Sequence, residues 1–217
     1  MLEDLDLIRK NINENKTADE VTIVCATKMR SAEVINELPS YSLYIAGENK
    51  VQELLEKYDF VRKDIEWRII GQLQTNKVKY IIDKVSLIES VDRESLADEI
   101  DKQAKKHGIK MKVLVEINAG EEESKGGVKI SDLDAMLEYV SAKENLSLVG
   151  LMSVFPIGAD ECLYAKVKDV FDKYKDKYAL TVLSMGMSND YITAVKYGAT
   201  EVRLGSALFG ARDYSKR

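Results

Sequence analysis

The sequence predicts an α/β protein: a single (β/α)8 barrel of the TIM type, built from one domain over residues 1–217. Short β-favouring runs alternate with amphipathic helical segments along the chain, and this alternation is typical of parallel strands with right-handed crossovers. Several runs are apolar almost throughout, as expected for parallel strands buried on both faces. Eight strand-like runs favour closure into a barrel, and a doubly wound open sheet is the alternative.

The N-terminal half contributes a helix and then four βα units. Leu2, Leu5, Ile8 and Ile12 recur at helical spacing and predict an opening helix. The run VTIVCAT predicts the first strand, at 21–27. Further strands are expected at 43–46, 66–70 and 85–90, and the first two of these end near Gly47 and Gly71. Helices are expected at 31–37, 48–58 and 75–82, and after a cap at Asp92.

The C-terminal half repeats the pattern. We expect strands at 112–118, 146–151, 181–184 and 201–204, and helices after a cap at Ser131, at 160–174, after Ser188 and from 207 onward. Met185, Gly186 and Met187 are expected to form a turn before Ser188, which is a typical N-cap residue.

Composition excludes several classes of function. The 217 residues carry a net charge of −5, which argues against a general nucleic-acid surface. Two cysteines and one histidine argue against a structural zinc site. No apolar run reaches membrane-spanning length, and the acidic N-terminus differs from a signal peptide, so we expect a cytoplasmic protein.

Two glycine–serine turns follow the last two expected strands. Ser188 and the pair Gly205–Ser206 precede helical segments, where free N–H groups and the helix dipole favour an anion. Barrels commonly bind phosphate in the loops after strands seven and eight. The alternative is that both are only tight turns.

Two charged residues sit where a barrel keeps its chemistry. Lys28 follows an apolar strand at the expected barrel mouth, where desolvation lowers the pKa of an amine and permits Schiff-base chemistry. It could instead extend into solvent. Arg203 lies within the last strand, where an inward side chain needs a partner, either the pyridine nitrogen of a cofactor or a core carboxylate. It could instead face outward.

At these residues the sequence resembles the pyridoxal phosphate homeostasis proteins (the YggS/PROSC family), related in fold to the N-terminal barrel of alanine racemase. The matching stretches cover almost the whole chain: VTIVCATK, GENKVQELLEK, WRIIGQLQTNK, INAGEEESKGG, GLMSV, LSMGMSND and VRLGSALFGAR. They occur in the family's order and spacing.

The resemblance implies a bound pyridoxal 5′-phosphate, held by Lys28 as a Schiff base, with Arg203 facing the pyridine nitrogen. It implies that the phosphate is surrounded by Ser184, Gly186, Ser188, Gly205 and Ser206, and that the ring is lined by Asn49 and Met152.

The chain also departs from the family. Many members read S-K-T-K-P at the lysine, where this chain has Thr27-Lys28-Met29-Arg30-Ser31. Arg68 and Gln72 stand where many members have histidine. These replacements leave the lysine unaffected but put the polar contacts around the third strand in doubt.

We therefore expect a carrier or regulator of intracellular pyridoxal phosphate without robust turnover, acting as a monomer and serving pyridoxal-phosphate-dependent apoenzymes. A racemase-like enzyme is the alternative, but a racemase needs acid–base groups on both faces of its substrate. In alanine racemase another subunit's extra domain supplies the second group, and we expect no such domain within 217 residues. A cofactor-free aldolase using Lys28 would need nearby carboxylates, which the expected strand ends do not obviously provide.

Overall fold

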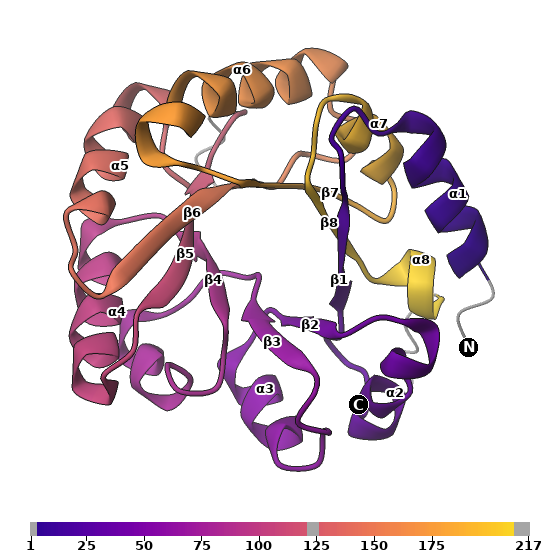
Figure 1. Ribbon diagram of the computed structural model, residues 1–217, viewed down its shortest axis with the longest axis horizontal. Coiled ribbons are helices and arrows are strands. Elements are labelled where there is room, and N and C mark those ends of the chain that lie inside the picture. The colour runs from indigo at the N-terminus through magenta and orange to yellow at the C-terminus, as the bar shows by residue number, and fades with distance from the viewer. Residues whose placement is uncertain (1–3, 121–125, 211–217) are drawn as a thin grey trace.

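The computed structural model describes residues 4–120 and 126–210, which form a closed barrel of eight parallel strands in chain order. Pairing of the last strand with the first closes the sheet, so the predicted barrel is confirmed and the open sheet is excluded (Figure 1). The strands are β1 (Thr22–Ala26), β2 (Ile45–Glu48), β3 (Glu66–Ile69), β4 (Leu87–Val91), β5 (Met111–Ile117), β6 (Leu146–Ser153), β7 (Val182–Met187) and β8 (Glu201–Leu204).

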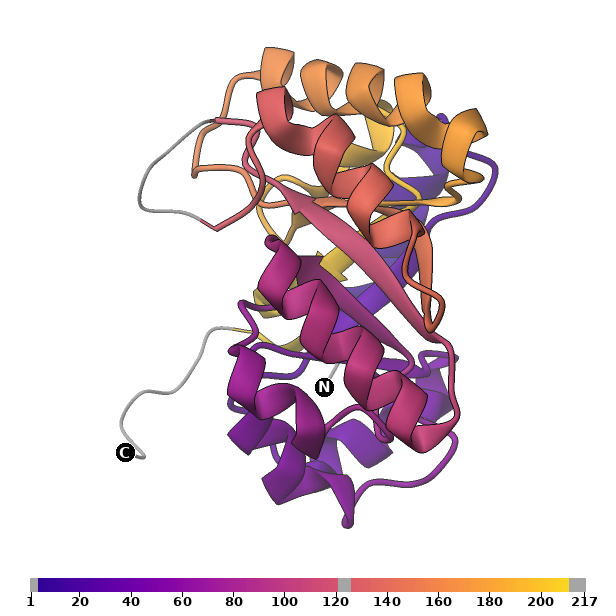
Figure 2. The ribbon, with the colours of Figure 1, turned by 90° about the vertical axis from the view of Figure 1, so that its left-hand side faces the viewer.

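Helices surround the strands, and Figure 2 shows the longer ones lying along the outside of the barrel. The α-helices are α1 (Leu5–Asn15), α2 (Ala32–Asn36), α3 (Val51–Tyr58), α4 (Glu94–His107), α5 (Leu133–Ser141), α6 (Glu161–Tyr178), α7 (Tyr191–Lys196) and α8 (Ser206–Phe209). Three 3-10 segments complete the described elements: η1 (Leu38–Tyr41), η2 (Thr75–Tyr80) and η3 (Ile130–Asp132).

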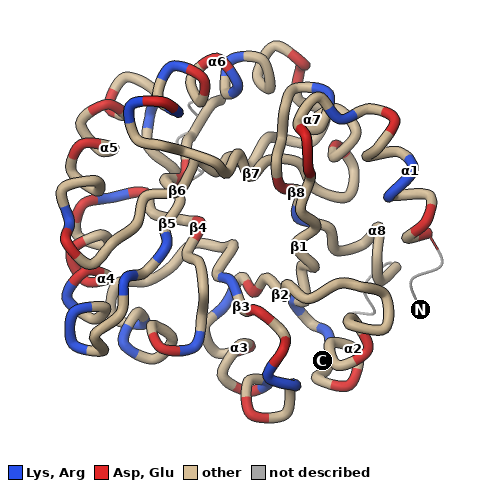
Figure 3. Tube along the Cα trace, viewed as in Figure 1, with Lys and Arg blue, Asp and Glu red and all other residues tan. Residues whose placement is uncertain are grey.

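The main core lies between the strands and the helices. Ile8 of α1, Leu54 of α3, Ile100 of α4, Leu137 of α5 and Val167 of α6 are all buried in it. Burying these side chains removes apolar area from water, which is the dominant favourable contribution to folding. Charges of both signs are interspersed along the outer helices, and a smaller number lie on the strands (Figure 3).

The chain around β7 differs from the expected turn. Met185, Gly186 and Met187 continue the strand, and the pairing with β8 shifts register between Ser184 and Met187. Gly186 has φ +93, and a Cβ there would lie 2.5 Å from the Cβ of Ala194 on α7. Glycine is required here because it permits both the backbone conformation and the close helix.

Several predicted boundaries and caps are wrong. Asp92 and Ser131 are not the caps of their helices, because the N-cap residues are Arg93 for α4 and Asp132 for α5. Asp92 instead pairs with the Arg93 guanidinium at 2.5 Å. The segment predicted as a helix at 75–82 is the 3-10 segment η2.

Strand β2 begins two residues later than expected, so Gly47 lies inside it. A Cβ at Gly47 would meet Val24 at 2.8 Å and Ile70 at 2.9 Å, both of which fill the barrel interior. The glycine therefore makes room for neighbouring side chains and does not end the strand.

Two kinds of feature are absent from the described residues. No helix within 4–120 and 126–210 has the length and apolar character needed to cross a membrane. In the same part of the chain, no group of three or more His, Cys, Asp or Glu side chains is arranged to hold a metal ion.

Candidate functional site

A cavity of about 410 Å³ lies at the C-terminal ends of β1, β7 and β8. This is the end of the barrel where such folds place their sites, and its size is typical of small-molecule pockets. Residues predicted for the site that line it are Lys28, Ser188, Arg203, Gly205 and Ser206. A larger and more open hollow of about 720 Å³ lies at the opposite end of the barrel, away from all of these residues.

Lys28 sits in a tight turn directly after β1. The Arg30 N–H donates to the Thr27 carbonyl at 3.0 Å, which closes the turn, and Met29 adopts a left-handed φ of 61. Lys28 is half-buried and lines the cavity, so its position at the barrel mouth agrees with the prediction from sequence.

Arg203 forms part of the cavity wall and is only 4% exposed. Its guanidinium donates from one nitrogen to Ser184 Oγ at 2.7 Å and from the other to the Ser153 carbonyl at 2.8 Å. The inward arginine therefore does have partners, and these are a hydroxyl and a carbonyl. The two bonds fix the plane of the guanidinium beside the cavity.

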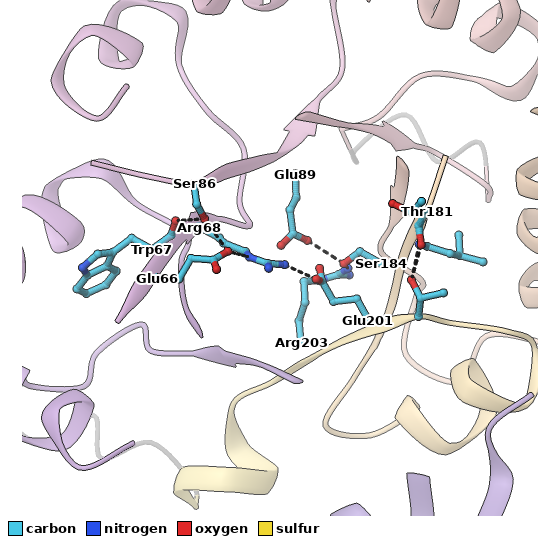
Figure 4. Close-up of polar contacts among 11 residues, drawn as sticks. Glu66, Trp67, Arg68, Ser86, Glu89, Thr181, Ser184, Glu201 and Arg203 are labelled. Carbon is cyan, nitrogen blue, oxygen red and sulfur yellow. Dashed lines mark hydrogen bonds and ion pairs between the residues drawn. The ribbon is translucent and has the colours of Figure 1, made fainter. Parts of the chain in front are cut away.

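Behind Arg203 lies a buried carboxyl group. Ser184 Oγ donates to Glu89 Oε2 at 2.8 Å, while no hydrogen-bond partner is found for Glu89 Oε1 among the described residues (Figure 4). Burial raises the pKa of Glu89 well above its usual value, and the nearby Glu201 carboxylate raises it further. The charges of Arg203 and Arg68 and the Ser184 hydrogen bond oppose this shift. Glu89 is therefore favoured in its neutral form.

Other charged side chains lie in the barrel interior beside its apolar residues. Arg68 pairs with Glu201 and, at 2.9 Å, with Glu66. The arginine that departs from the family pattern is thus part of an ion-pair network in the interior (Figure 4). Nearer the cavity end, burial raises the pKa of Glu116 to about 7, with Asp92 adding to the effect.

Ser188 connects the two loops that were predicted to hold an anion. Its Oγ accepts hydrogen bonds from the Gly205 N–H at 3.1 Å and the Ala207 N–H at 3.0 Å. The expectation that Ser188 caps α7 is wrong, because the N-cap residue is Asp190. Since α7 and α8 are short helices, the anion-binding capacity of these loops rests on local N–H and hydroxyl groups.

An aromatic wall was not predicted. Phe155 and Tyr164 line the cavity with ring centroids 4.1 Å apart. The Tyr164 hydroxyl donates to Asp190 Oδ2 at 2.7 Å, and Asp190 Oδ1 accepts from the Met187 N–H at 2.7 Å. Burial and the Asp190 bond raise the pKa of Tyr164. An aromatic at helical spacing is typical of a core residue, so the sequence carried no signal for this role.

The other predicted site residues do not line the cavity. Met152 is buried beside Leu87 and Leu114, Ser184 bonds Glu89 and Arg203, and Gly186 packs its backbone against α7. Asn49 follows β2, and its Oδ1 is buried with no partner found among the described residues. Their contacts with a cofactor stay predictions.

Comparison with known proteins assigns the family. The family model of the alanine racemase N-terminal domain matches residues 4–213. The chain is 45% identical over 196 residues to the pyridoxal phosphate homeostasis protein of Aquifex aeolicus, which covers 87% of this chain and 86% of that protein. It is 35% identical over 214 residues to the Homo sapiens protein of the same name, and this match covers 90% of this chain and 78% of that protein. The chain belongs to the pyridoxal phosphate homeostasis protein family.

Solved structures agree with this family membership. PipY of Synechococcus elongatus, solved with pyridoxal phosphate bound, is 29% identical with a TM-score of 0.85, over 96% of this chain and 99% of that chain. An alanine racemase of Clostridium difficile is 17% identical with a TM-score of 0.76, over 96% of this chain and 60% of the racemase. At that identity the racemase shows a shared fold alone.

The buried Glu89 predicts how stability depends on pH in this family member. As pH rises past about 4.3, a glutamate in the unfolded chain ionises first, so stability falls until the raised pKa of the folded state is passed. Glu89→Gln removes this contribution and keeps an oxygen that accepts from Ser184. As the pH rises from about 4 to about 8, the free energy of unfolding of this variant, measured in urea, should fall less than that of the wild type.

Glu56→Gln is the control, because Glu56 is an exposed residue of α3. This variant should follow the wild-type pH profile. Coinciding profiles for Glu89→Gln and the wild type would show that the Glu89 pKa is not raised.

Proposed function

We propose that this protein carries pyridoxal 5′-phosphate in the cavity above β1, β7 and β8, with Lys28 as the attachment point. It acts in cofactor homeostasis and not as an efficient enzyme. The observation that carries the proposal is that Lys28, Arg203 and the linked Ser188–Gly205 loops all line one cavity of about 410 Å³. Support comes from relatives named pyridoxal phosphate homeostasis proteins and from PipY, solved with the cofactor bound.

The side chains present fit the chemistry of this cofactor. The bound group would supply an aldehyde, whose carbon forms a C=N bond with an amine while its oxygen leaves as water. Lys28 offers that amine, and Phe155 and Tyr164 offer an apolar wall for a flat ring. Ser188 and Ser206 would offer hydroxyl groups to the phosphate, while the Gly205 N–H, which already donates to Ser188 Oγ, would hold that serine in place.

Arg203 would limit how strongly the cofactor ring withdraws electrons. A guanidinium stays charged at all relevant pH values and offers only donors, so it would keep a pyridine nitrogen beside it unprotonated. An unprotonated ring is a weaker electron sink, which disfavours proton removal from a substrate. Ser184 and Ser153 hold the guanidinium in this orientation.

We infer further that the carrier works as a monomer in the cytoplasm and supplies apoenzymes that need this cofactor. Charges of both signs spread over the outer helices support the monomer, because such a surface is typical of a solvated face (Figure 3). Apoenzymes are the receivers that a carrier role requires.

The first test replaces the attachment point. After incubation with pyridoxal phosphate and reduction with borohydride, the wild type should carry the label on the Lys28 peptide and Lys28→Ala should carry none. Thermal unfolding should change little, since Lys28 is only half-buried and lies outside the apolar core. Lys10→Ala, which removes an exposed lysine of α1, is the control and should label normally. A label on another lysine would refute the assignment.

The second test concerns the phosphate. In Lys28→Ala, where only non-covalent binding remains, pyridoxal should bind at least about tenfold more weakly than pyridoxal phosphate, because a charge-assisted hydrogen bond contributes about 1.5–3 kcal/mol. Isothermal titration measures both affinities. Ser188→Ala in the same background should reduce the difference in affinity between the two compounds, because it removes the hydrogen bonds that connect the two loops. Equal affinities for the two compounds would argue against a phosphate site in these loops.

The third test separates carrier from racemase. L- and D-alanine are incubated in heavy water with the cofactor-loaded protein, and deuterium at the α-carbon is measured by mass spectrometry. We expect at most trace incorporation, because we expect these 217 residues to supply no second acid–base group opposite Lys28, and such a group contributes about 10²–10⁴-fold in rate. Rapid exchange with inversion that disappears in Lys28→Ala would make this protein an enzyme.

A further inference from the structure

Helix α3 contacts both residues that flank Lys28. Lys57 Nζ donates to the Thr27 carbonyl at 3.0 Å, and the Met29 N–H donates to Glu53 Oε2 at 2.8 Å. Glu53 and Lys57 lie one helical turn apart, with 3.7 Å between Oε2 and Nζ. One helix therefore binds the turn on both sides of the attachment lysine.

A buried carboxylate anchors the Lys57 side of this arrangement. Glu48, at the end of β2, has a fully buried side chain whose Oε1 accepts from Lys57 Nζ at 2.8 Å and from Thr27 Oγ1 at 2.7 Å. The Lys57 side chain is only 12% exposed, so both charges are largely removed from water. A desolvated pair of this kind holds its geometry, because separating the charges would leave the buried Glu48 carboxylate without its cation.

The turn depends on these outside contacts. Met29 has a φ of 61, a left-handed conformation that is unfavourable for residues other than glycine. The single bond from Arg30 N–H to the Thr27 carbonyl closes the turn. Glu53 binds the strained residue itself and Lys57 binds the carbonyl of the closing bond.

We propose that Glu53 and Lys57 are positioning residues for Lys28: together with Glu48 they hold the turn at 27–30 so that the lysine amine is presented to the cavity. The proposal rests on the proposed function, since positioning matters only if Lys28 is the attachment point. None of the three residues lines the cavity. All three lie in the stretch GENKVQELLEK at 47–57, in which Asn49 is the one residue predicted to line the cofactor ring.

Positioning has a direct chemical consequence. The amine nitrogen must meet the aldehyde carbon in an aligned geometry, and a displacement of about 1 Å can cost about 10²-fold in rate. A preorganised turn also lowers the conformational entropy lost on attachment. Glu53 and Lys57 should therefore affect covalent attachment more than non-covalent binding.

The test for Glu53 compares Glu53→Ala with Glu53→Gln, which keeps an oxygen able to accept from the Met29 N–H. Glu56→Ala, an exposed site on the same helix, controls for the helix itself. Three quantities are measured: hydrogen exchange of the Met29 amide without cofactor, the rate of borohydride-trapped labelling of Lys28 by pyridoxal phosphate, and the affinity for pyridoxine 5′-phosphate, which lacks the aldehyde.

In Glu53→Ala we expect faster Met29 exchange and labelling about tenfold slower, with pyridoxine phosphate affinity unchanged. Glu53→Gln and Glu56→Ala should match the wild type in all three. Unchanged labelling in Glu53→Ala, or an equal loss of labelling and phosphate-ester affinity, would overturn the positioning role. If the wild type fails to label Lys28, the proposed function fails, and the positioning of Lys28 for attachment falls with it. In that case, faster Met29 exchange in Glu53→Ala would still show that Glu53 contacts the turn.

Lys57 needs a different design, because removing it alone leaves Glu48 buried and unpaired. The double variant Glu48→Gln/Lys57→Met removes both charges and keeps an oxygen to accept from Thr27 Oγ1. It should label Lys28 more slowly than the single variant Glu48→Gln, at equal affinity for pyridoxine phosphate. Equal labelling rates in these two variants would remove Lys57 from the proposal.

Discussion

Pairing between β8 and β1 is the constraint on which the site depends. This parallel pair sets Val24 opposite Arg203 and Cys25 opposite Leu204, and it closes the barrel. Without this pairing, the turn after β1 and the loop after β8 would have no fixed position relative to each other, because they come from opposite ends of the chain. Closure therefore brings Lys28 and Arg203 to the lining of one cavity.

The barrel interior beside this site contains buried ionisable groups. Glu89 and Glu201 each keep a buried oxygen for which no partner is found in the described part of the chain. Such groups oppose folding, and proteins usually retain them where function needs them. Here they surround the two interior arginines, Arg68 and Arg203 (Figure 4). Ser184 joins the carboxyl side of this network to the cavity wall.

Much of the site was predictable because a barrel collects the C-terminal ends of its strands at one mouth. Lys28 and Gly205 could be placed at this mouth from the sequence alone, because each of them follows a predicted strand. Tyr164 and Asp190 could not be placed in this way, because their bond joins α6 to the loop after β7. Glu89 did carry a signal, an acidic residue inside an apolar strand, whose meaning depended on which residues faced it.

The sequence by itself determined the alternation of strands and helices, the barrel and the family, because apolar periodicity and local motifs are written along the chain. Only the tertiary structure decided what Ser188 does, since its two donors lie on a separate loop. It also decided that Gly186 continues a strand, because the close approach of α7 fixes that backbone. Glu53, Lys57 and Glu48 meet the turn of Lys28 only once β1 and β2 pair, because side-chain contacts between elements depend on register and distance.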